Sequence, residues 1–222
     1  MALQELFAVR RVPLAPGLVG IADGEALLAE MTAAWLAERP HDAALFPADL
    51  AAATGLRRGE LFALRWSDVD FEARTIHVHA SNYAARISDE TKTEAGDRRV
   101  PLFPSIRQVL LERKARSRFS QPDDFLFPSV VGTPQDPGNF VRREFRPALR
   151  AAGLEGFRWH DLRHYAVSAL IADGADIKLL QAIAGHATAA MTLDVYGHLM
   201  DERVTEAADR FDPLRVAAVV PR

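Results

Sequence analysis

The spacing of apolar residues predicts helices over most of the first third of the chain. In residues 23–38 the apolar positions recur every three or four residues, as in an amphipathic helix. Residues 43–53 have similar helical character, but they contain Pro47, so we expect a break there or a helix that starts near Pro47. Thr54 is then a plausible N-cap for a third helix that reaches Trp66, with an apolar face formed by Leu56, Leu61 and Leu64.

The next stretch changes to the alternating pattern of β-strands. Residues 75–79 (Thr-Ile-His-Val-His) alternate like a half-buried strand. Residues 86–92 and 98–102 predict a hairpin with residues 94–97 at its tip. A small antiparallel sheet is therefore expected after the third helix.

From residue 104 onward the pattern is helical again. A long loop rich in proline and glycine is expected at residues 120–138, around the short apolar segment Phe125-Leu126-Phe127. Gly153, Gly174 and Gly185 lie where the C-termini of helices favour glycine. The helices are predicted at 104–118, 139–152, 160–172, 176–184 and 190–210. The fold class predicted from the pattern is mainly α with a small antiparallel β-sheet (α+β).

Composition narrows the class of protein without identifying a partner. Hydrophobic residues make up 49% and charged residues 26% of the 222 residues, as in ordinary globular proteins, and no apolar run is long enough to span a membrane. The chain has no cysteine, which excludes disulfides and thiolate metal sites, and a cytoplasmic location is expected. The net charge is −3, but residues 51–165 carry 19 basic and 15 acidic side chains between two acidic flanks. Because affinity for DNA depends on local phosphate contacts, this balance permits a nucleic-acid partner.

The strongest candidate chemistry lies at Trp159-His160-Asp161-Leu162-Arg163-His164-Tyr165, at the start of an apolar, helix-forming run. On a helix, residues three and four apart share a face, so His160, Arg163 and His164 are expected to form a small cationic cluster. Such a cluster suits a phosphate.

Four separated segments, taken together, resemble the catalytic domain of the tyrosine recombinases (phage integrases). They are Ala53-Thr54-Gly55-Leu56-Arg57, Lys92 of the predicted hairpin, His160 to His164, and Ala184-Gly185-His186 followed ten residues later by Tyr196. Their order and the intervening sheet fit the family. The resemblance covers residues 22–210, which we expect to form the catalytic domain between an irregular N-terminal arm (1–21) and a tail (211–222).

The resemblance implies cleavage of a DNA strand without a metal or other cofactor. Tyr196 would attack the scissile phosphate to give a 3′-phosphotyrosine and a free 5′-hydroxyl, and a second strand would then rejoin the DNA. Arg57 and Arg163 would hold the phosphate oxygens, and His160 and His186 would donate hydrogen bonds or move protons. Lys92 would protonate the departing oxygen. Glu60 and His164 would have supporting roles, Glu60 beside the first arginine.

Elementary chemistry agrees with these roles. Two guanidinium groups match the oxygens of a phosphodiester that gains negative charge in its transition state. A tyrosine with the ordinary pKa of about 10 is ionised only about one part in a thousand at pH 7, so its hydroxyl needs cations and a proton acceptor nearby. Each residue alone has a plainer interpretation, however. Arg57 would be an exposed helix arginine, Lys92 a turn lysine, His160 or His164 a structural histidine, His186 a helix cap and Tyr196 a core tyrosine.

Three departures from the family pattern keep other hypotheses open. Ala184 stands where the family usually has leucine, and Pro47 and Asp49 interrupt the helix before Thr54. Full-length members of the family also carry an N-terminal core-binding domain of roughly a hundred residues, which we do not expect in this sequence. A remnant that binds DNA without cleaving it is therefore the main alternative. A metallohydrolase using His160 and His164 lacks an obvious third ligand. A type IB topoisomerase would share the chemistry but relax supercoils.

The resemblance also implies partners. Double-stranded DNA is the expected substrate, bound by a homo-tetramer whose protomers exchange C-terminal tails, for which residues 216–220 are the candidate segment. Accessory DNA-bending proteins are possible further partners, and no membrane is expected.

Overall fold

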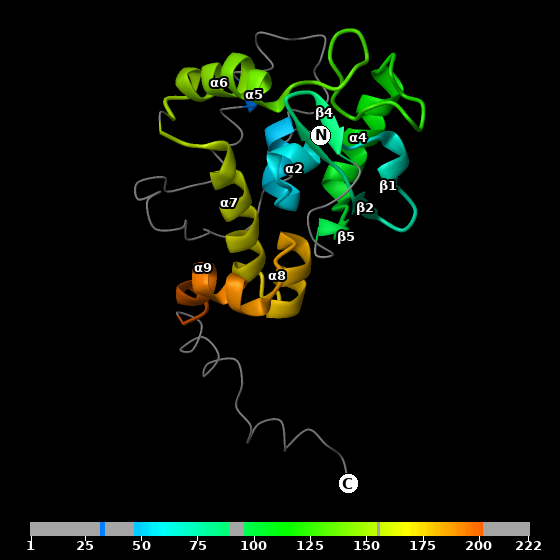
Figure 1. Ribbon diagram of the computed structural model, residues 1–222. Coiled ribbons are helices and arrows are strands. Elements are labelled where there is room, and N and C mark those ends of the chain that lie inside the picture. Colours follow the sequence, from blue (N-terminus) through cyan, green and yellow to red (C-terminus); the bar gives the residue numbers. More distant parts are fainter. Residues whose placement is uncertain (1–31, 34–46, 89–95, 155, 202–222) are drawn as a thin grey trace.

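The computed structural model describes residues 32–33, 47–88, 96–154 and 156–201. For residues 198–201 it describes the backbone alone. Helices α2 (Pro47–Thr54) and α7 (Trp159–Ala172) pack against each other at its centre (Figure 1). Several predictions lie outside these residues, namely the arm 1–21, most of the helix 23–38, Lys92, and everything beyond Asp201, including the tail 211–222. Thr32 and Ala33, the two described residues of that N-terminal helix, are helical.

Helix α2 begins at Pro47, as predicted, because proline is tolerated in the first turn, where its missing N–H has no intrahelical partner. The prediction of a helix capped by Thr54 and reaching Trp66 is wrong. Thr54 ends α2 and its hydroxyl donates to the carbonyl of Leu50, while Gly55 adopts a left-handed φ of 66° that terminates the helix. The short helix α3 (Arg58–Leu61) follows, with Arg57 as its N-cap.

The sheet is built from strands that the sequence located only in part. A 3-10 turn (η2, Trp66–Asp68) leads into β1 (Val69–Asp70), which pairs with β2 (Thr75–Val78), and β2 pairs with β5 (Arg98–Pro101), all antiparallel. The register places Ile76 opposite Val100, and both side chains are fully buried. The predicted strand at 75–79 is confirmed over residues 75–78.

The predicted pairing of residues 86–92 with 98–102 is wrong for residues 86–88, the part of the first strand that the structure describes. Strand β4 (Arg86–Ser88) pairs instead with β3 (Ser81–Tyr83) in a separate two-stranded sheet. Ala84 and Ala85 form the turn with φ values of 51° and 62°, a conformation that asparagine or glycine would normally signal. The buried side chain of Asn82 holds this hairpin in place by donating to the carbonyls of Phe62 and Gln135.

The second half of the chain follows the predicted helical pattern closely. Helix α4 (Pro104–Arg116) buries Ile106 and Leu110, and the long loop that follows buries Phe125-Leu126-Phe127. The predicted helix at 139–152 is present as α5 (Pro137–Phe140), a π-helical stretch (η4, Val141–Phe145) and α6 (Arg146–Ala151).

After α7 come α8 (Ile177–Ala184) and α9 (Ala189–Asp201). Gly153, Gly174 and Gly185 follow helices with φ values of 71°, 95° and 59°, so their predicted positions at helix C-termini are confirmed. The fold is mainly α with small antiparallel sheets, as expected.

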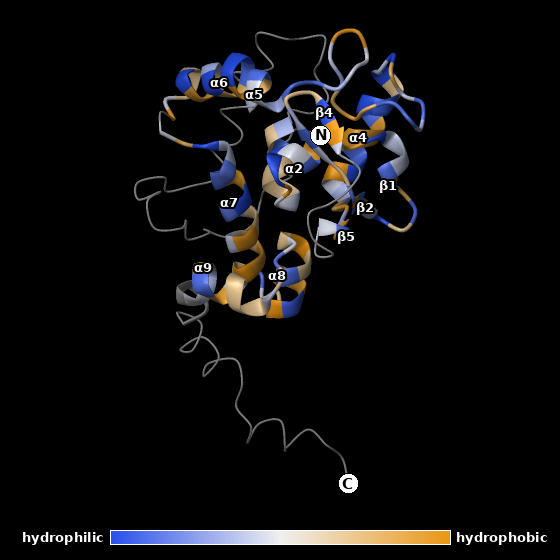
Figure 2. Cartoon of the chain, in the orientation of Figure 1, coloured by the Kyte–Doolittle hydropathy of each residue, from blue (hydrophilic) through white to orange (hydrophobic). Residues whose placement is uncertain are grey.

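Two hydrophobic clusters hold these elements together. The larger one lies around α2 and the sheet and contains an aromatic group, in which the rings of Phe62, Phe140 and Phe145 contact Trp159. The smaller one joins the second half of α7 to α8 and α9, and Figure 2 colours much of α8 and of the neighbouring part of α7 as hydrophobic. It consists of Val167, Ile171, Leu180, Ala184 and Tyr196, the last of which is one of the active-site candidates.

Candidate active site

A buried carboxylate between two arginines organises one side of the site. Glu60, on α3, accepts hydrogen bonds from both terminal nitrogens of Arg98, at 3.1 and 2.8 Å. It also accepts two from Arg57, one from the guanidinium group at 2.7 Å and one from the main-chain N–H at 2.8 Å. Burial alone would raise the pKa of Glu60, but hydrogen bonds and charge from Arg98, and then hydrogen bonds from Arg57, lower it to about 2. Glu60 therefore stays ionised at neutral pH and fixes both guanidinium groups.

The ends of two helices hold the arginines from the other side. The last carbonyls of a helix have no intrahelical donor, and here arginines supply one. Arg163, on α7, donates to Gly55 at the end of α2 (2.7 Å) and to Ala184 at the end of α8, and Arg57 donates to Gly185 at 3.1 Å. These contacts bring residues that are more than a hundred positions apart in the sequence into one site.

The site carries an excess of positive charge. Arg57 and Arg98 pair with the carboxylate of Glu60, and Arg163 lies near enough to interact electrostatically with all three. These four side chains together carry two more positive than negative charges. Burial lowers the pKa of Arg163 to about 10, and repulsion from Arg57 and Arg98 adds to that effect while Glu60 opposes it. A bound anion would relieve this repulsion.

The two histidines of the predicted site lie beside this charge and are neutral at pH 7. Burial and the Arg163 charge lower the pKa of His160. The same two causes, with Arg57, lower the pKa of His186 to about 4. The Nδ1 atom of His186 lies 2.9 Å from the hydroxyl of Thr192, which fixes its ring at the start of α9. Each neutral imidazole can donate one N–H to an anion.

Tyr196 comes from α9 and lies deep in the smaller hydrophobic cluster, with only 2% of the residue exposed. Its hydroxyl is 2.9 Å from Nδ1 of His164. Burial raises the pKa of Tyr196, and the charge of Arg163 partly opposes that rise. The structure thus brings Arg57, His160, Arg163, His186 and Tyr196 to one region, with Glu60 and His164 touching members of the set. Lys92 lies outside the described residues.

The predicted cationic face of α7 divides into three environments. His160 lines a cleft, Arg163 is buried against main-chain carbonyls, and His164 turns to Tyr196 while its ring packs edge-on against His160 with centroids 4.8 Å apart. Among the described residues, no group of three or more histidine, aspartate or glutamate side chains could hold a metal ion. Likewise, no described helix is long and apolar enough to cross a membrane.

Sequence reasoning missed Arg98. Its signal was the alternation of β5, in which Val100 faces inward and the residue two positions earlier must face the same way. An arginine at an inward strand position requires a buried partner, and Glu60 is that partner. Arg98 also donates from Nε to the carbonyl of Ile183 at 3.1 Å, which ties the sheet to α8.

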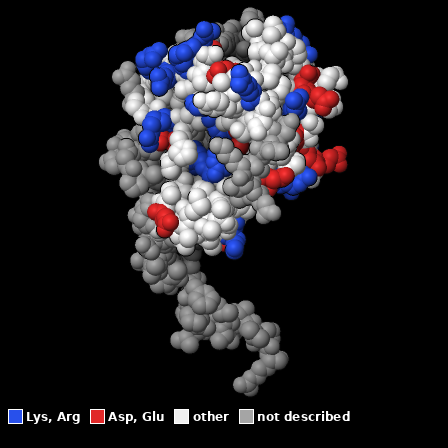
Figure 3. Space-filling view, in the orientation of Figure 1, with Lys and Arg blue, Asp and Glu red and all other residues white. Residues whose placement is uncertain are grey.

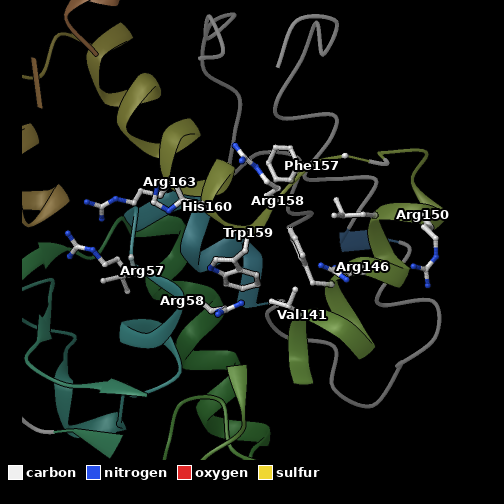
Figure 4. A pocket seen from close by; sticks show the side chains of 14 residues that line it. Arg57, Arg58, Val141, Arg146, Arg150, Phe157, Arg158, Trp159, His160 and Arg163 are labelled. Carbon is white, nitrogen blue, oxygen red and sulfur yellow. The ribbon is translucent and has the colours of Figure 1, made fainter. Parts of the chain in front are cut away.

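A cleft of about 750 Å³ extends from Arg57, His160 and Arg163 to helix α6. Figure 4 shows Arg57, His160 and Arg163 at one end and Arg146 and Arg150 at the other. Its floor is apolar, formed by residues such as Phe145, Phe157 and Trp159. The face in Figure 3 shows basic side chains over α6 and again in a hollow near the middle of the molecule.

Known proteins of one kind are similar to this chain in sequence and in fold. The chain is similar to the tyrosine recombinase XerC-like protein of Caldanaerobacter subterraneus (27% identity over 74% of this chain and 48% of the relative). It is also similar to the ICEBs1 integrase of Bacillus subtilis (32% identity, 79% of this chain and 50% of the relative). The chain therefore spans about half the length of these curated relatives.

Solved structures agree. The Tn1549 transposon integrase in complex with a circular intermediate DNA matches with a TM-score of 0.65 at 26% identity, over 85% of this chain and 62% of that one. XerA recombinase matches with a TM-score of 0.63 at 26% identity, over 90% and 67% of the two chains. The model of the phage integrase family matches residues 24–203. The chain belongs to the phage integrase family, the tyrosine recombinases.

Proposed function

We propose that this chain cleaves and rejoins double-stranded DNA in site-specific recombination or integration, through a covalent 3′-phosphotyrosine at Tyr196. The observation that carries the proposal is the unbalanced positive charge of Arg57, Arg98 and Arg163 around one carboxylate, next to a buried tyrosine. A phosphodiester supplies the missing negative charge, and its oxygens accept the directional hydrogen bonds that guanidinium groups donate.

In the proposed reaction each residue has one task. Arg57 and Arg163 bind the non-bridging oxygens, with His160 and His186 as neutral donors beside them. The oxygen of Tyr196 forms a bond to phosphorus while the bond from phosphorus to the 5′-oxygen breaks, and Lys92 protonates that oxygen. Glu60 holds Arg57 in place. By analogy with oxyanion holes, loss of one arginine donor lowers the rate by roughly 10²–10³.

A nicked duplex tests the proposal without knowledge of the natural target. The duplex carries a randomised sequence and a nick placed so that the strand released on cleavage diffuses away, which traps any covalent protein–DNA product. We expect an adduct that survives denaturation, whose protease-derived peptide carries the nucleotide on Tyr196 and whose DNA reveals the preferred site. Absence of any adduct, or attachment at another residue, would contradict the proposal.

The second candidate is a remnant that binds DNA without cleaving it. The 2% exposure of Tyr196 favours it, because a nucleophile must reach phosphorus. The same experiment separates the two: the remnant shifts DNA in gels but forms no adduct.

The cleft supports a path for the DNA backbone beyond the scissile phosphate. Arg146 and Arg150 are both exposed along α6 at its far end. Replacing both with alanine should weaken binding of a mixed-sequence duplex and lower the slope of log affinity against log salt by roughly 0.9 for each lost phosphate contact. As a matched control, alanine at the exposed Arg99 and Arg116, which do not line this cleft, should leave the slope unchanged. Equal effects in the two pairs would argue against the path.

Assembly and boundaries belong to the same proposal. We place the catalytic domain at residues 22–210, which the family match over 24–203 supports, between the arm 1–21 and the tail 211–222. We also infer a homo-tetramer on DNA with exchanged tails, located with DNA in the bacterial or phage-infected cell, with DNA-bending proteins as accessory partners. Half-exposed apolar side chains of α8 and α9, namely Leu179, Met191, Leu193 and Val195, offer a surface for a neighbour's tail.

Deleting residues 213–222 tests the tail. The truncated chain should form smaller complexes on DNA by light scattering while its melting temperature stays the same. Unchanged complexes would mean that the tail does not join protomers.

A further inference from the structure

His164 and Tyr196 form a unit that the proposed arginine and lysine chemistry leaves unexplained. The Nδ1 atom of His164 is 2.9 Å from the phenolic oxygen, and the two ring centroids are 5.7 Å apart. Among the described residues, the side chain that forms a hydrogen bond with the hydroxyl of Tyr196 is His164. We infer that His164 is the proton acceptor for Tyr196, taking the phenolic proton as the oxygen attacks DNA. This inference rests on the proposed function.

Helix α7 fixes the two side chains against each other. Val167 and Ile171 follow His164 at intervals of three and four residues, so they continue the same face of the helix. That face, with Leu180 and Ala184 of α8, buries the ring of Tyr196. The apolar packing that positions the tyrosine ring therefore also determines which side chain meets its hydroxyl, and that side chain is His164.

The environment of Tyr196 makes a proton acceptor necessary. An ordinary phenol is ionised about one part in a thousand at pH 7, and burial raises the pKa of Tyr196 further. The charge of Arg163 opposes this rise but does not reverse it. Spontaneous ionisation is therefore rarer for this tyrosine than for one in water, and a base within hydrogen-bond distance removes that barrier.

The groups that face His164 keep it in the accepting state. Burial lowers its pKa, the neighbouring His160, Arg163 and Arg158 lower it as well, and Asp161 opposes them. At pH 7 the ring is neutral, and an unprotonated Nδ1 can accept the proton. The charge then balances: the proton moves from the phenol to Nδ1, the oxygen–phosphorus bond forms, and the bond to the 5′-oxygen breaks as that oxygen takes a proton from Lys92. Rejoining runs the same steps backwards.

The same contact has a second interpretation, a latch that shelters Tyr196 until DNA arrives. The two make opposite predictions for removal of His164. A proton acceptor speeds attachment, so its loss slows the reaction. A latch restrains the tyrosine, so its loss speeds the reaction.

The test compares three variants in the nicked-duplex assay, using the DNA sequence recovered with the wild-type chain. His164→Asn keeps an acceptor near the position of Nδ1 but cannot take a proton. His164→Ala removes the ring and leaves space that added imidazole can fill. His77→Asn changes a histidine on β2 that lies outside the site. The rate of adduct formation is measured from pH 5 to pH 9, and the fold of each variant is checked by thermal unfolding.

We expect His164→Asn and His164→Ala to form the adduct about 10²–10⁴ times more slowly at pH 7 than the wild type. Their rates should rise about tenfold per pH unit up to pH 9, because the phenolate must then form unaided. The wild-type rate should stop rising once His164 is neutral, below its ordinary pKa of about 6.5. Imidazole should partly restore His164→Ala, and His77→Asn should behave as the wild type.

Other outcomes overturn the inference. A near-normal rate in His164→Asn would mean that the ring only positions the tyrosine, and a faster rate in His164→Ala would identify a latch. If the wild type itself forms no adduct, the proposed function fails and this inference falls with it. If the wild type forms the adduct and the His164 variants form it at the same rate, the proposed function stands and this inference alone fails.

Discussion

Tyr196→Phe should abolish covalent attachment to DNA while leaving both the fold and DNA binding in place. The substitution removes the one oxygen that the proposed reaction joins to phosphorus, so no adduct should form above background even after long incubation. The ring that fills the cluster of Val167, Ile171, Leu180 and Ala184 is retained. Stability should change by only about 1 kcal/mol, the usual worth of one hydrogen bond, here the one to His164.

The measurement pairs denaturing gels of the nicked-duplex reaction with gel shifts under native conditions. Tyr83→Phe is the control, because Tyr83 is 82% exposed at the turn of the β3–β4 hairpin and should react normally. Residual adduct in Tyr196→Phe would assign the nucleophile to another side chain. Loss of DNA binding together with the adduct would instead show that the substitution disturbs α9.

Helical periodicity predicted most of the fold because the helices after residue 100 obey the local rules that it measures. Apolar spacing located α4, α7 and α8, and glycines with positive φ marked the ends of α7 and α8. The β3–β4 hairpin escaped prediction because alanines occupy its turn, and the buried amide of Asn82 compensates for that local cost. Here tertiary contacts outweigh local preference, and a single sequence does not reveal them.

The site was predictable to the extent that its members stand in a recognisable order. Arg57, His160, Arg163, His186 and Tyr196 could be named from their resemblance to the family, as could Glu60 beside Arg57, but most of their contacts could not. Nothing in the sequence said that Arg163 would meet the carbonyls of Gly55 and Ala184, or that Glu60 would lie between two arginines. Arg98 was missed because its importance depends on Glu60, which is 38 residues away in the sequence.

The position of Glu60 leads to the second large effect. Glu60→Gln keeps the shape of the side chain but removes the charge that balances Arg57 and Arg98. Lowering the pKa of Glu60 from 4.5 to about 2 corresponds to roughly 3 kcal/mol, at about 1.36 kcal/mol for each pH unit. We therefore expect Glu60→Gln to lose about 3 kcal/mol of unfolding free energy at pH 7, measured by urea denaturation. Glu112→Gln, at an exposed position on α4, should change it by no more than about 0.5 kcal/mol.

The pH dependence identifies the cause. A carboxylate whose pKa is lowered on folding stabilises the protein above the pKa of the unfolded chain and loses that contribution as the pH falls toward the folded value. The gap between wild type and Glu60→Gln should therefore be full above about pH 5 and shrink steadily toward pH 2. A gap that stays constant with pH would attribute the loss to packing rather than charge.

Sulfate should stabilise Glu60→Gln more than the wild type, because an anion beside three unbalanced arginines replaces part of the charge that the substitution removed.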